Sequence, residues 1–441
     1  MAVGGILPAF HALLLASSMN TVLRPLCLMT FAIAQSGCGS DGAIAIGNPP
    51  AAAAQVDAAI MAPAPGLTAL SIIPGVPAWS TTSGNAGHTN YVPASFDPAQ
   101  FSYRFTWTLP AGATVSQAQL ALDNGQAFAV VSEAAGRWSL RAVDEVTGKE
   151  NWTAALGKLD IVDPPATHDG KVVLSTAAGL DGDALWVFDQ RTGKLLDKRT
   201  IPGRRMAGHS TADMRMAPVI AGDGIYVNDR SAGKLIAKFD AATHALLWQS
   251  DWAGAANHAF APAVEDGRVY AAFSGGGLLG FDARTGKTVL EHHRQFTDAP
   301  MPGMVSDGTA YALAAGGLVA TDLRGSFKWQ GPELLELAAP PGPVLYGVAG
   351  NAIQAIDSAT GKTAWRIPSP VPTSVSNSIL ATKNLLFISS YSQSNAGTYA
   401  LDIATRKVVW RYPAGGWLSI SPNGVLYITP ARGAVTAVNL R

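Results

Sequence analysis

Arginine and histidine side chains concentrate in three consecutive stretches of this chain, each between two segments with the pattern of β-strands. Loops displayed on a rigid scaffold are where binding residues usually lie, so we expect such a cluster to contact another protein, with its charges tuning association and specificity. The alternative interpretation is a set of solvated loops whose arginines pair with Asp213, Asp251 and Asp298. The candidate partner-binding residues are Arg204, Arg205, His209, Arg215, His258, His292, His293 and Arg294.

Residue patterns typical of catalysis are missing from the sequence. It contains no HExxH, GxSxG, P-loop or CxxC motif. Both cysteines, Cys27 and Cys38, lie near the N-terminus, which leaves the rest of the chain without thiol chemistry. We therefore predict no catalytic residues, no metal ligands and no resident cofactor.

A repeated pattern, DxxTGKxxW, marks the elements that must position the basic loops. It is complete from Asp144 to Trp152 and from Asp357 to Trp365. Degraded copies begin roughly 35–50 residues apart, at Asp189, Asp240, Asp282, Asp322 and Asp402. The copies at 189 and 282 lack the Trp, and the copy at 240 lacks the Gly-Lys pair. A period of this size is typical of a propeller or a solenoid.

Each copy of the pattern suits a corner between two strands. The Asp can accept hydrogen bonds from nearby backbone N–H groups, the Gly can adopt positive φ, and the Trp can pack between neighbouring repeats. We therefore predict a structural role, without catalysis, for the repeat residues. These are Asp144, Gly148, Trp152, Asp189, Gly193, Trp248, Asp282, Gly286, Trp329, Asp357, Gly361, Trp365, Asp402, Trp410 and Trp107.

The segments around each copy predict four short strands, separated by turns such as the Asp-Gly at 223–224. No long window has helical periodicity, so we predict an all-β, eight-bladed β-propeller of four-stranded antiparallel blades over residues 79–441. The last blade lacks an outer strand, because the chain stops just after Asn439, where the Asp of a further copy is expected. The upstream segment 101–109, with Trp107, has no preceding copy and is predicted to supply that strand, closing the ring without an open edge.

The N-terminal region has the features of a leader. Residues 1–37 are expected to be a signal peptide, with Met19 as an alternative start. Ser36, Gly37 and Cys38 match the end of a bacterial lipobox, which predicts a lipid anchor on Cys38; an A-x-A cleavage after Ala34 would instead release a soluble protein. Residues 38–78, rich in Ala, Pro and Gly, are expected to be a tether, with an arm packed on the propeller as the alternative.

The charges of the chain balance. There are 31 Lys plus Arg and 31 Asp plus Glu. A nucleic-acid partner is therefore not expected, because such proteins carry a marked excess of basic residues.

The repeats, together with WSTTSGNAGHTNYVP at 79–93, resemble the quinoprotein-type (PQQ-like) propeller repeats of bacteria. In the dehydrogenases of that family the resemblance implies a quinone held with calcium, ligands from Glu and Asn, an Asp base and often adjacent cysteines. The sequence has no Cys-Cys pair, and none of those positions can be carried over. The chain is more similar to the B-subunit lipoprotein of the Bam complex, which carries such repeats without a cofactor.

The sequence therefore favours a non-enzymatic interaction scaffold of the bacterial envelope. By resemblance, we expect a lipid-anchored, periplasm-facing, monomeric propeller whose partners are envelope proteins, including the outer-membrane assembly machinery. Two alternatives stay open. One is a diverged oxidoreductase dependent on PQQ and calcium, and the other is a propeller that binds carbohydrate or cell wall.

Overall fold

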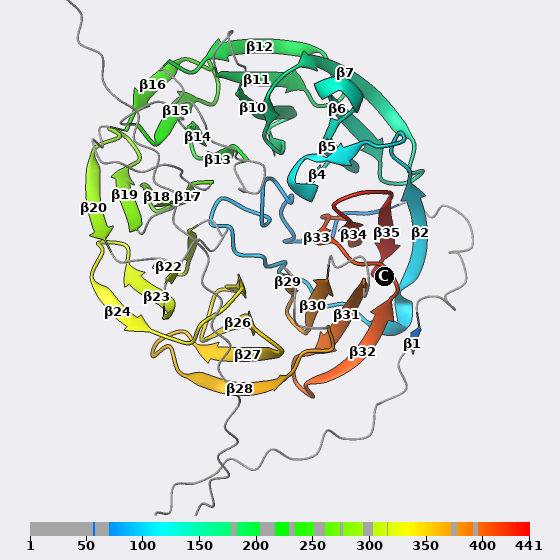
Figure 1. The fold of residues 1–441 in the computed structure, drawn as a ribbon, viewed down its shortest axis with the longest axis vertical. Coiled ribbons are helices and arrows are strands. Elements are labelled where there is room, and N and C mark those ends of the chain that lie inside the picture. Colours follow the sequence, from blue (N-terminus) through cyan, green and yellow to red (C-terminus); the bar gives the residue numbers. More distant parts are fainter. Residues whose placement is uncertain are drawn as a thin grey trace, which may run out of the picture. The chain divides into compact units, whose positions relative to one another are not determined.

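The computed structural model describes residues 56–57, 70–177, 183–202, 217–228, 234–250, 261–273, 277–293, 303–314, 316–371, 377–390 and 396–441. The chain divides into two units, and the first, Met1–Pro49, lies outside the described residues. In the second unit, eight sheets are arranged in a ring around a central axis (Figure 1). The predicted all-β, eight-bladed propeller is confirmed. No helix among the described residues is long and apolar enough to cross a membrane.

The blades are numbered here by the order of their DxxTGKxxW copies, and their strands run from the axis outward. Blade 1 holds β4 Ala121–Asp123, β5 Gln126–Ser132, β6 Arg137–Asp144 and β7 Glu150–Lys158, with β3 Thr114–Val115 also on β5. Blade 2 holds β8 Ile161–Val162, β9 Ala166–His168, β10 Lys171–Ala177, β11 Ala184–Asp189 and β12 Leu195–Thr200. Blade 3 holds β13 Val219–Ala221, β14 Gly224–Asn228, β15 Ile236–Asp240 and β16 Leu246–Gln249. Blade 4 holds β17 Ala263–Glu265, β18 Arg268–Phe273, β19 Gly277–Asp282 and β20 Thr288–His293.

The other four blades follow the same order. Blade 5 holds β21 Met304–Ser306, β22 Thr309–Ala314, β23 Gly317–Asp322 and β24 Phe327–Gln330. Blade 6 holds β25 Glu336–Ala338, β26 Val344–Ala349, β27 Ala352–Asp357 and β28 Thr363–Pro368. Blade 7 holds β29 Asn377–Ala381, β30 Leu385–Ser390, β31 Gly397–Asp402 and β32 Lys407–Tyr412. Blade 8 holds β33 Trp417–Ile420, β34 Val425–Thr429, β35 Val435–Asn439 and β2 Ser102–Trp107. Short 3-10 turns lie at Pro98–Gln100, Ser116–Ala118 and Ala134–Gly136.

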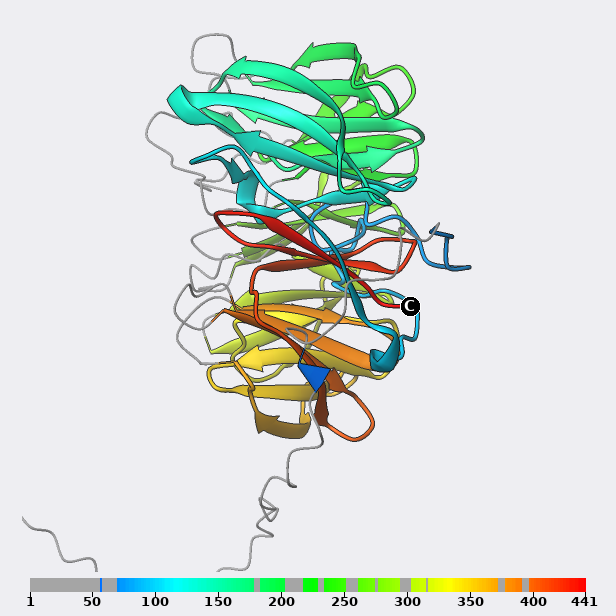
Figure 2. The same ribbon diagram turned by 90° about the vertical axis from the view of Figure 1, so that its right-hand side faces the viewer.

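Blade 8 joins the two ends of the propeller. The N-terminal strand β2 pairs antiparallel with β35, from Ser102 opposite Asn439 to Trp107 opposite Val435. The predicted closure by an upstream strand is therefore confirmed. A further two-residue strand, β1 Val56–Asp57, runs parallel to β32 on the outer edge of blade 7, where it is visible as a short arrow in the edge-on view (Figure 2).

Every blade has a β-bulge in its outermost strand. In blade 3, for example, Lys238 lies opposite Trp248 while Phe239 lies opposite Leu246, so Leu247 is the extra residue. The same shift recurs in the other seven blades. Because a bulge turns the following side chain, it sets where the residue after it points. That residue occupies the Trp position of the repeat.

In blades 1, 3, 4 and 5, the side chain at the Trp position packs on the repeat glycine of the next blade. The ring of Trp248 lies against Gly286, where an added Cβ would come within 2.6 Å of a ring carbon. Its indole Nε1 donates to the carbonyl oxygen of Ala283, 3.1 Å away. Trp152 and Trp329 make the same contacts with Gly193 and Gly361 of their neighbours. Each of these Trp contacts therefore joins two blades through one large ring and one residue without a side chain.

The closure from blade 8 to blade 1 uses a different residue. Here Phe105 and not Trp107 lies on Gly148, because the bulge falls at Arg104. Trp107 is buried and its Nε1 donates to Glu150 Oε1 over 3.0 Å. The sequence interpretation of Trp107 as the repeat Trp thus differs from the structure by two residues.

A segment that enters the ring, the central arm (residues 73–96), lies in the middle of the propeller (Figure 1). It forms hydrogen bonds with the innermost part of every blade. Starting at blade 8 and then running from blade 1 to blade 7, these bonds join Ile73 N to Pro422 O, Trp79 to Leu122, Thr167 N to Ser80 O, Thr81 Oγ1 to Pro218 O, Val264 N to Ala86 O, Val305 N to Gly87 O, Ala339 N to Thr89 O and Ala381 N to Asn90 O. The WSTTSGNAGHTNYVP motif at 79–93 thus binds blades 1 to 7, and Ile73 of the same central arm adds the bond to blade 8.

Residues 79–94 of the central arm are buried or half-buried although many of them are polar. His88 is fully buried, with Nδ1 at 2.7 Å from the carbonyl of Thr82 and Nε2 at 3.0 Å from that of Pro262. Leu70 and Ile73 pack on the core of blade 8, and Ile72 stays exposed. Within the stretch expected to be a tether, Leu70, Ile73 and Val76 thus contact the propeller, whereas Ile72 does not.

Candidate functional site

The basic residues singled out from the sequence fall mostly outside the described part of the chain. Those with no described position are Arg204, Arg205, His209, Arg215, His258 and Arg294, and the same holds for the anchor candidate Cys38. His292 and His293 lie in β20, opposite Leu278 and Gly277, but their side chains are not described. The grouping of these residues on one surface stays a prediction.

The repeat corners are well defined and show what their residues do. Asp144 Oδ1 accepts hydrogen bonds from both the N–H and the hydroxyl of Thr147, each over 2.7 Å. The same pair of bonds forms in the copies at Asp189, Asp240, Asp282, Asp357 and Asp402. These bonds from Thr hold the pKa of Asp189 and Asp357 below its ordinary value. One carboxylate oxygen of each of these aspartates is thus bound within its own turn, as a structural role for the corner requires.

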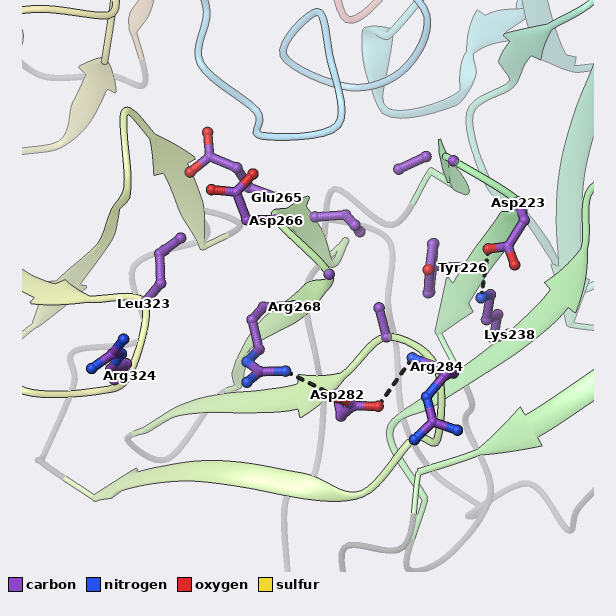
Figure 3. A pocket seen from close by; sticks show the side chains of 15 residues that line it. Asp223, Tyr226, Lys238, Glu265, Asp266, Arg268, Asp282, Arg284, Leu323 and Arg324 are labelled. Carbon is purple, nitrogen blue, oxygen red and sulfur yellow. Dashed lines mark hydrogen bonds and ion pairs between the residues drawn. The ribbon is translucent and has the colours of Figure 1, made fainter.

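A groove opens over blades 3, 4 and 5 on the face that carries these corners, here called the corner face (Figure 3). Its volume is about 940 Å³, near the upper end of the range for ligand sites. Two kinds of turn line it. One joins the first and second strands, at residues 221–223 and 265–268, and the other is the repeat corner, at residues 282–284 and 323–324.

Two ion pairs are built into the groove wall. Lys238 Nζ binds Asp223 Oδ1 over 2.7 Å, and the Lys238 side chain is only 4% exposed. Burial alone would lower the pKa of Lys238, but the bonds to Asp223 and Tyr226 outweigh it and raise the pKa. Arg268 binds Asp282 Oδ2 over 3.0 Å. These four charges neutralise one another.

The groove also carries charges that no described residue neutralises. Arg284 and Arg324 are exposed, and their side chains have no hydrogen bond or ion pair within the described part of the chain. Asp266 is exposed and likewise without a described partner. Beside it, Glu265 Oε2 accepts one hydrogen bond, from Gly308 N over 3.1 Å.

Glu265 lies in a locally negative environment. Burial raises its pKa, and the neighbouring carboxylates of Asp266 and Asp307 raise it further, against the hydrogen bond from Gly308. Figure 3 draws Glu265 and Asp266 together on one side of the groove, and Arg284 with Asp282 on the other. The groove is therefore dipolar, with an acidic side and a basic side separated by neutralised pairs. Such a surface presents charges of both signs to the solvent.

The groove was missed by sequence reasoning, although a signal exists. Arg284 and Arg324 stand two residues after the repeat Asp in blades 4 and 5, where blades 6 and 7 have Ala359 and Ala404. Comparing the copies at this position gives only part of the sector, because blade 2 also has an arginine there, Arg191, and blade 3 has Ala242. Among the described residues, no three His, Cys, Asp or Glu side chains are grouped so that they could hold a metal ion.

Eight four-stranded blades, joined by Asp-Thr-Gly corners and closed by an N-terminal strand, define this chain as a propeller of PQQ-like repeats. The family model described as outer membrane protein assembly factor BamB matches residues 63–233, 229–342 and 349–441. The chain belongs to this family.

A curated relative, the outer membrane protein assembly factor BamB of Bordetella pertussis (strain Tohama I), is 30% identical over 132 residues. That match spans 28% of this chain and 33% of the length of the relative.

Solved structures share the fold at lower identity. BamB from Moraxella catarrhalis superposes with a TM-score of 0.56 at 18% identity, covering 77% of this chain and 97% of that one. Quinohemoprotein alcohol dehydrogenase from Comamonas testosteroni gives 0.57 at 14% identity, with 82% and 80% covered. A europium-containing methanol dehydrogenase gives 0.56 at 12% identity, with 82% and 98% covered. Scaffolds and dehydrogenases thus share this architecture, so the fold by itself does not decide between them.

Proposed function

We propose that this chain is a non-catalytic scaffold of the bacterial envelope that takes part in outer-membrane protein assembly. The observation that carries the proposal is the match of one BamB family model to almost the whole propeller. The central arm is hydrogen-bonded to all eight blades. A ring held together in this way suits a scaffold, because it can display loops while keeping its own shape. The proposal places the protein on the periplasmic side, as a monomer held by a lipid on Cys38.

The proposed contact surface is the set of basic loops between blades 2 and 5. In this proposal, Arg204, Arg205 and Arg215 bind acidic groups of an assembly partner, which would mainly govern association rate and specificity. Such loops, presented by a scaffold of short strands, are where binding residues concentrate.

Co-purification from detergent-solubilised envelopes tests the role. We expect barrel-assembly components to be recovered with the tagged chain, and to be lost when Arg204, Arg205 and Arg215 are changed together to Ala. A matched control changes three exposed arginines elsewhere, Arg366, Arg411 and Arg432, to Ala. Recovery of no assembly component with the unaltered chain would contradict the proposed role, and equal loss in both triple variants would remove the basic loops from it.

The anchor and the absence of a cofactor have separate tests. A lipid on Cys38 predicts that Cys38→Ser shifts the protein from the membrane fraction to the soluble fraction, and the mass of the mature N-terminal peptide identifies the modification. Incubation with PQQ and calcium should give neither a bound chromophore nor dye-linked dehydrogenase activity. A chromophore that survives gel filtration would contradict a non-catalytic role.

A further inference from the structure

We propose that the dipolar groove over blades 3–5 binds an extended segment of a partner protein, with acidic side chains against Arg284 and Arg324 and a basic side chain against Glu265 and Asp266. This goes beyond the scaffold role, because it names a surface and a ligand chemistry that do not depend on outer-membrane assembly. The groove lies on the corner face, whereas β12 ends and β13 begins at the opposite ends of blades 2 and 3.

The basic side of the groove is set up to receive carboxylates. The only carboxylate drawn beside Arg284 in Figure 3 is that of Asp282. Its two oxygens are already used, Oδ1 by Thr285 and Arg284 backbone groups and Oδ2 by Arg268. Arg284 therefore has five N–H donors without an acceptor in the described part of the chain. A guanidinium in this state binds a carboxylate in bidentate fashion when one arrives.

The acidic side is set up in the opposite sense. Glu265 and Asp266 are adjacent carboxylates, and Asp307 of the next blade adds a third negative charge to their surroundings. An ammonium or guanidinium group there would relieve the mutual repulsion, as an opposite charge within a few ångströms favours the ionised acid. A ligand with a single sign of charge would meet repulsion at one side of the groove, so charge complementarity requires both signs.

The size and the lining indicate a polypeptide segment as the occupant. The groove runs across three blades with a volume of about 940 Å³, open along its length, with Val264, Ala283 and Leu323 in its floor. Apolar side chains continue outward beyond each arginine, since Val289 and Phe327 are each 46% exposed on the outer strands that follow these corners. Alternating charged and apolar contacts along an extended path are typical of peptide recognition.

The test uses the full-length protein and short synthetic peptides labelled for fluorescence anisotropy. The first probe is a peptide with one Lys, then a Gly-Ser spacer that contains one Leu, then two Glu. The exchanged probe has Glu in place of Lys and Lys in place of each Glu. We expect the first probe to bind at low ionic strength, and the double substitution Arg284→Glu with Arg324→Glu to weaken it at least about tenfold. Adding Asp266→Lys should then make the exchanged probe the better ligand.

The control substitution is Arg191→Glu, which changes the equivalent exposed arginine in the corner of blade 2, outside the groove. It should leave binding of the first probe unchanged. Equal weakening by Arg191→Glu and by the double substitution would overturn the proposal, because general surface charge would then explain the binding. The proposal would also be overturned if neither probe bound to the wild-type protein. Neither result touches co-purification of assembly partners, so failure here and failure of the scaffold role are distinguishable.

Discussion

Asp197 of blade 2 and His244 of blade 3 are joined by a hydrogen bond across the interface of their blades. At the interface of blades 3 and 4, the equivalent positions hold the ring of Trp248 and Gly286. His244 Nδ1 lies 3.0 Å from Asp197 Oδ2, and the His side chain is 9% exposed. Asp197 follows the bulge of β12, at the Trp position of its repeat, and His244 stands at the Gly position of the next repeat, with φ of 57°. Two replacements in neighbouring copies thus compensate each other across one interface.

The first prediction is that these two replacements are energetically coupled. His244→Gly alone should lower the free energy of unfolding by about 1–3 kcal/mol, because it opens space and removes the His244 hydrogen bond to Asp197, which keeps only its local bonds to Lys198 and Arg199. Adding Asp197→Trp should recover that loss, since the new ring can pack on the introduced glycine as Trp152 does on Gly193. Urea denaturation of the wild type, both single variants and the double variant gives the coupling energy. Additive effects of the two changes would contradict compensation.

The second prediction concerns the ring-on-glycine contact. Gly286→Ala should cost about 1–2 kcal/mol for an Ala at its φ of 72°, and about 1–3 kcal/mol more because the new Cβ would lie 2.6 Å from a carbon of Trp248. Gly170→Ala provides the matched control, as Gly170 has φ of 69° and open space where the Cβ would go. Thermal or urea unfolding should therefore separate the two variants. Equal destabilisation would show that the Trp contact adds nothing to the backbone requirement.

The eight-bladed ring was predictable from sequence because its signal is repeated. The Asp-Thr-Gly corner needs only local bonds, such as those of Thr147 to Asp144, so each copy reveals itself within a few residues. The closing strand was predicted because the segment 101–109 has no DxxTGKxxW copy before it. The sequence pattern predicts Trp107 at the Trp position of this strand, whereas the structure has Phe105 there. The bulge at Arg104 shifts Phe105 onto Gly148, and a bulge of one residue leaves no mark in the local pattern.

The contacts that form the groove and those that seat the central arm could not be predicted from the sequence, and the reason is a different one. Their contacts join residues from several blades, such as Thr81 with Pro218 and Asn90 with Leu337, and depend on the curvature of the ring. The basic loops stay a prediction, because their residues from Arg204 to Arg215 lie outside the described part. Sequence patterns thus identify the units of the fold, while the binding surface depends on how those units are placed together.

The third prediction concerns the seat of the central arm. A Cβ at Gly87 would overlap the carbonyl oxygen of Val305, which is backbone of β21 and cannot turn aside. Gly87→Ala should therefore lower the unfolding free energy by about 2–3 kcal/mol and expose residues 79–96 to limited proteolysis. Gly75→Ala, near the start of the arm, has open space for the Cβ but a φ of 78°, so it measures backbone strain without a clash and should leave residues 79–96 protected. Protection of the arm in the Gly87 variant equal to that in the wild type would show that it is not held against blade 5.

The fourth prediction concerns the closure between blades 8 and 1, where Glu145 is 1% exposed. Burial raises the pKa of Glu145, against hydrogen bonds from Ser421 and Asn423 and the positive charge of Arg104. Between the ordinary Glu pKa and the raised one, the folded state binds more protons than the unfolded state. Stability from this group is therefore full below the ordinary pKa and is lost as pH rises through the raised pKa.

Glu145→Gln should remove this dependence, so the variant gains stability relative to the wild type as pH rises. The Asn423 Nδ2 hydrogen bond, 2.6 Å in the wild type, can be kept by the Gln carbonyl oxygen.

Glu150→Gln is a control of opposite sign. The hydrogen bonds from Arg141 and Trp107 outweigh the effect of burial at Glu150, so the pKa of Glu150 is lowered. The stability that Glu150 contributes is present above the ordinary Glu pKa and is lost as pH falls through the lowered one. Urea midpoints measured from about pH 3 to about pH 8 should diverge from the wild type toward high pH for Glu145→Gln, and converge with it toward low pH for Glu150→Gln. A Glu145→Gln difference that does not change with pH would mean that the buried carboxyl keeps one protonation state across this range.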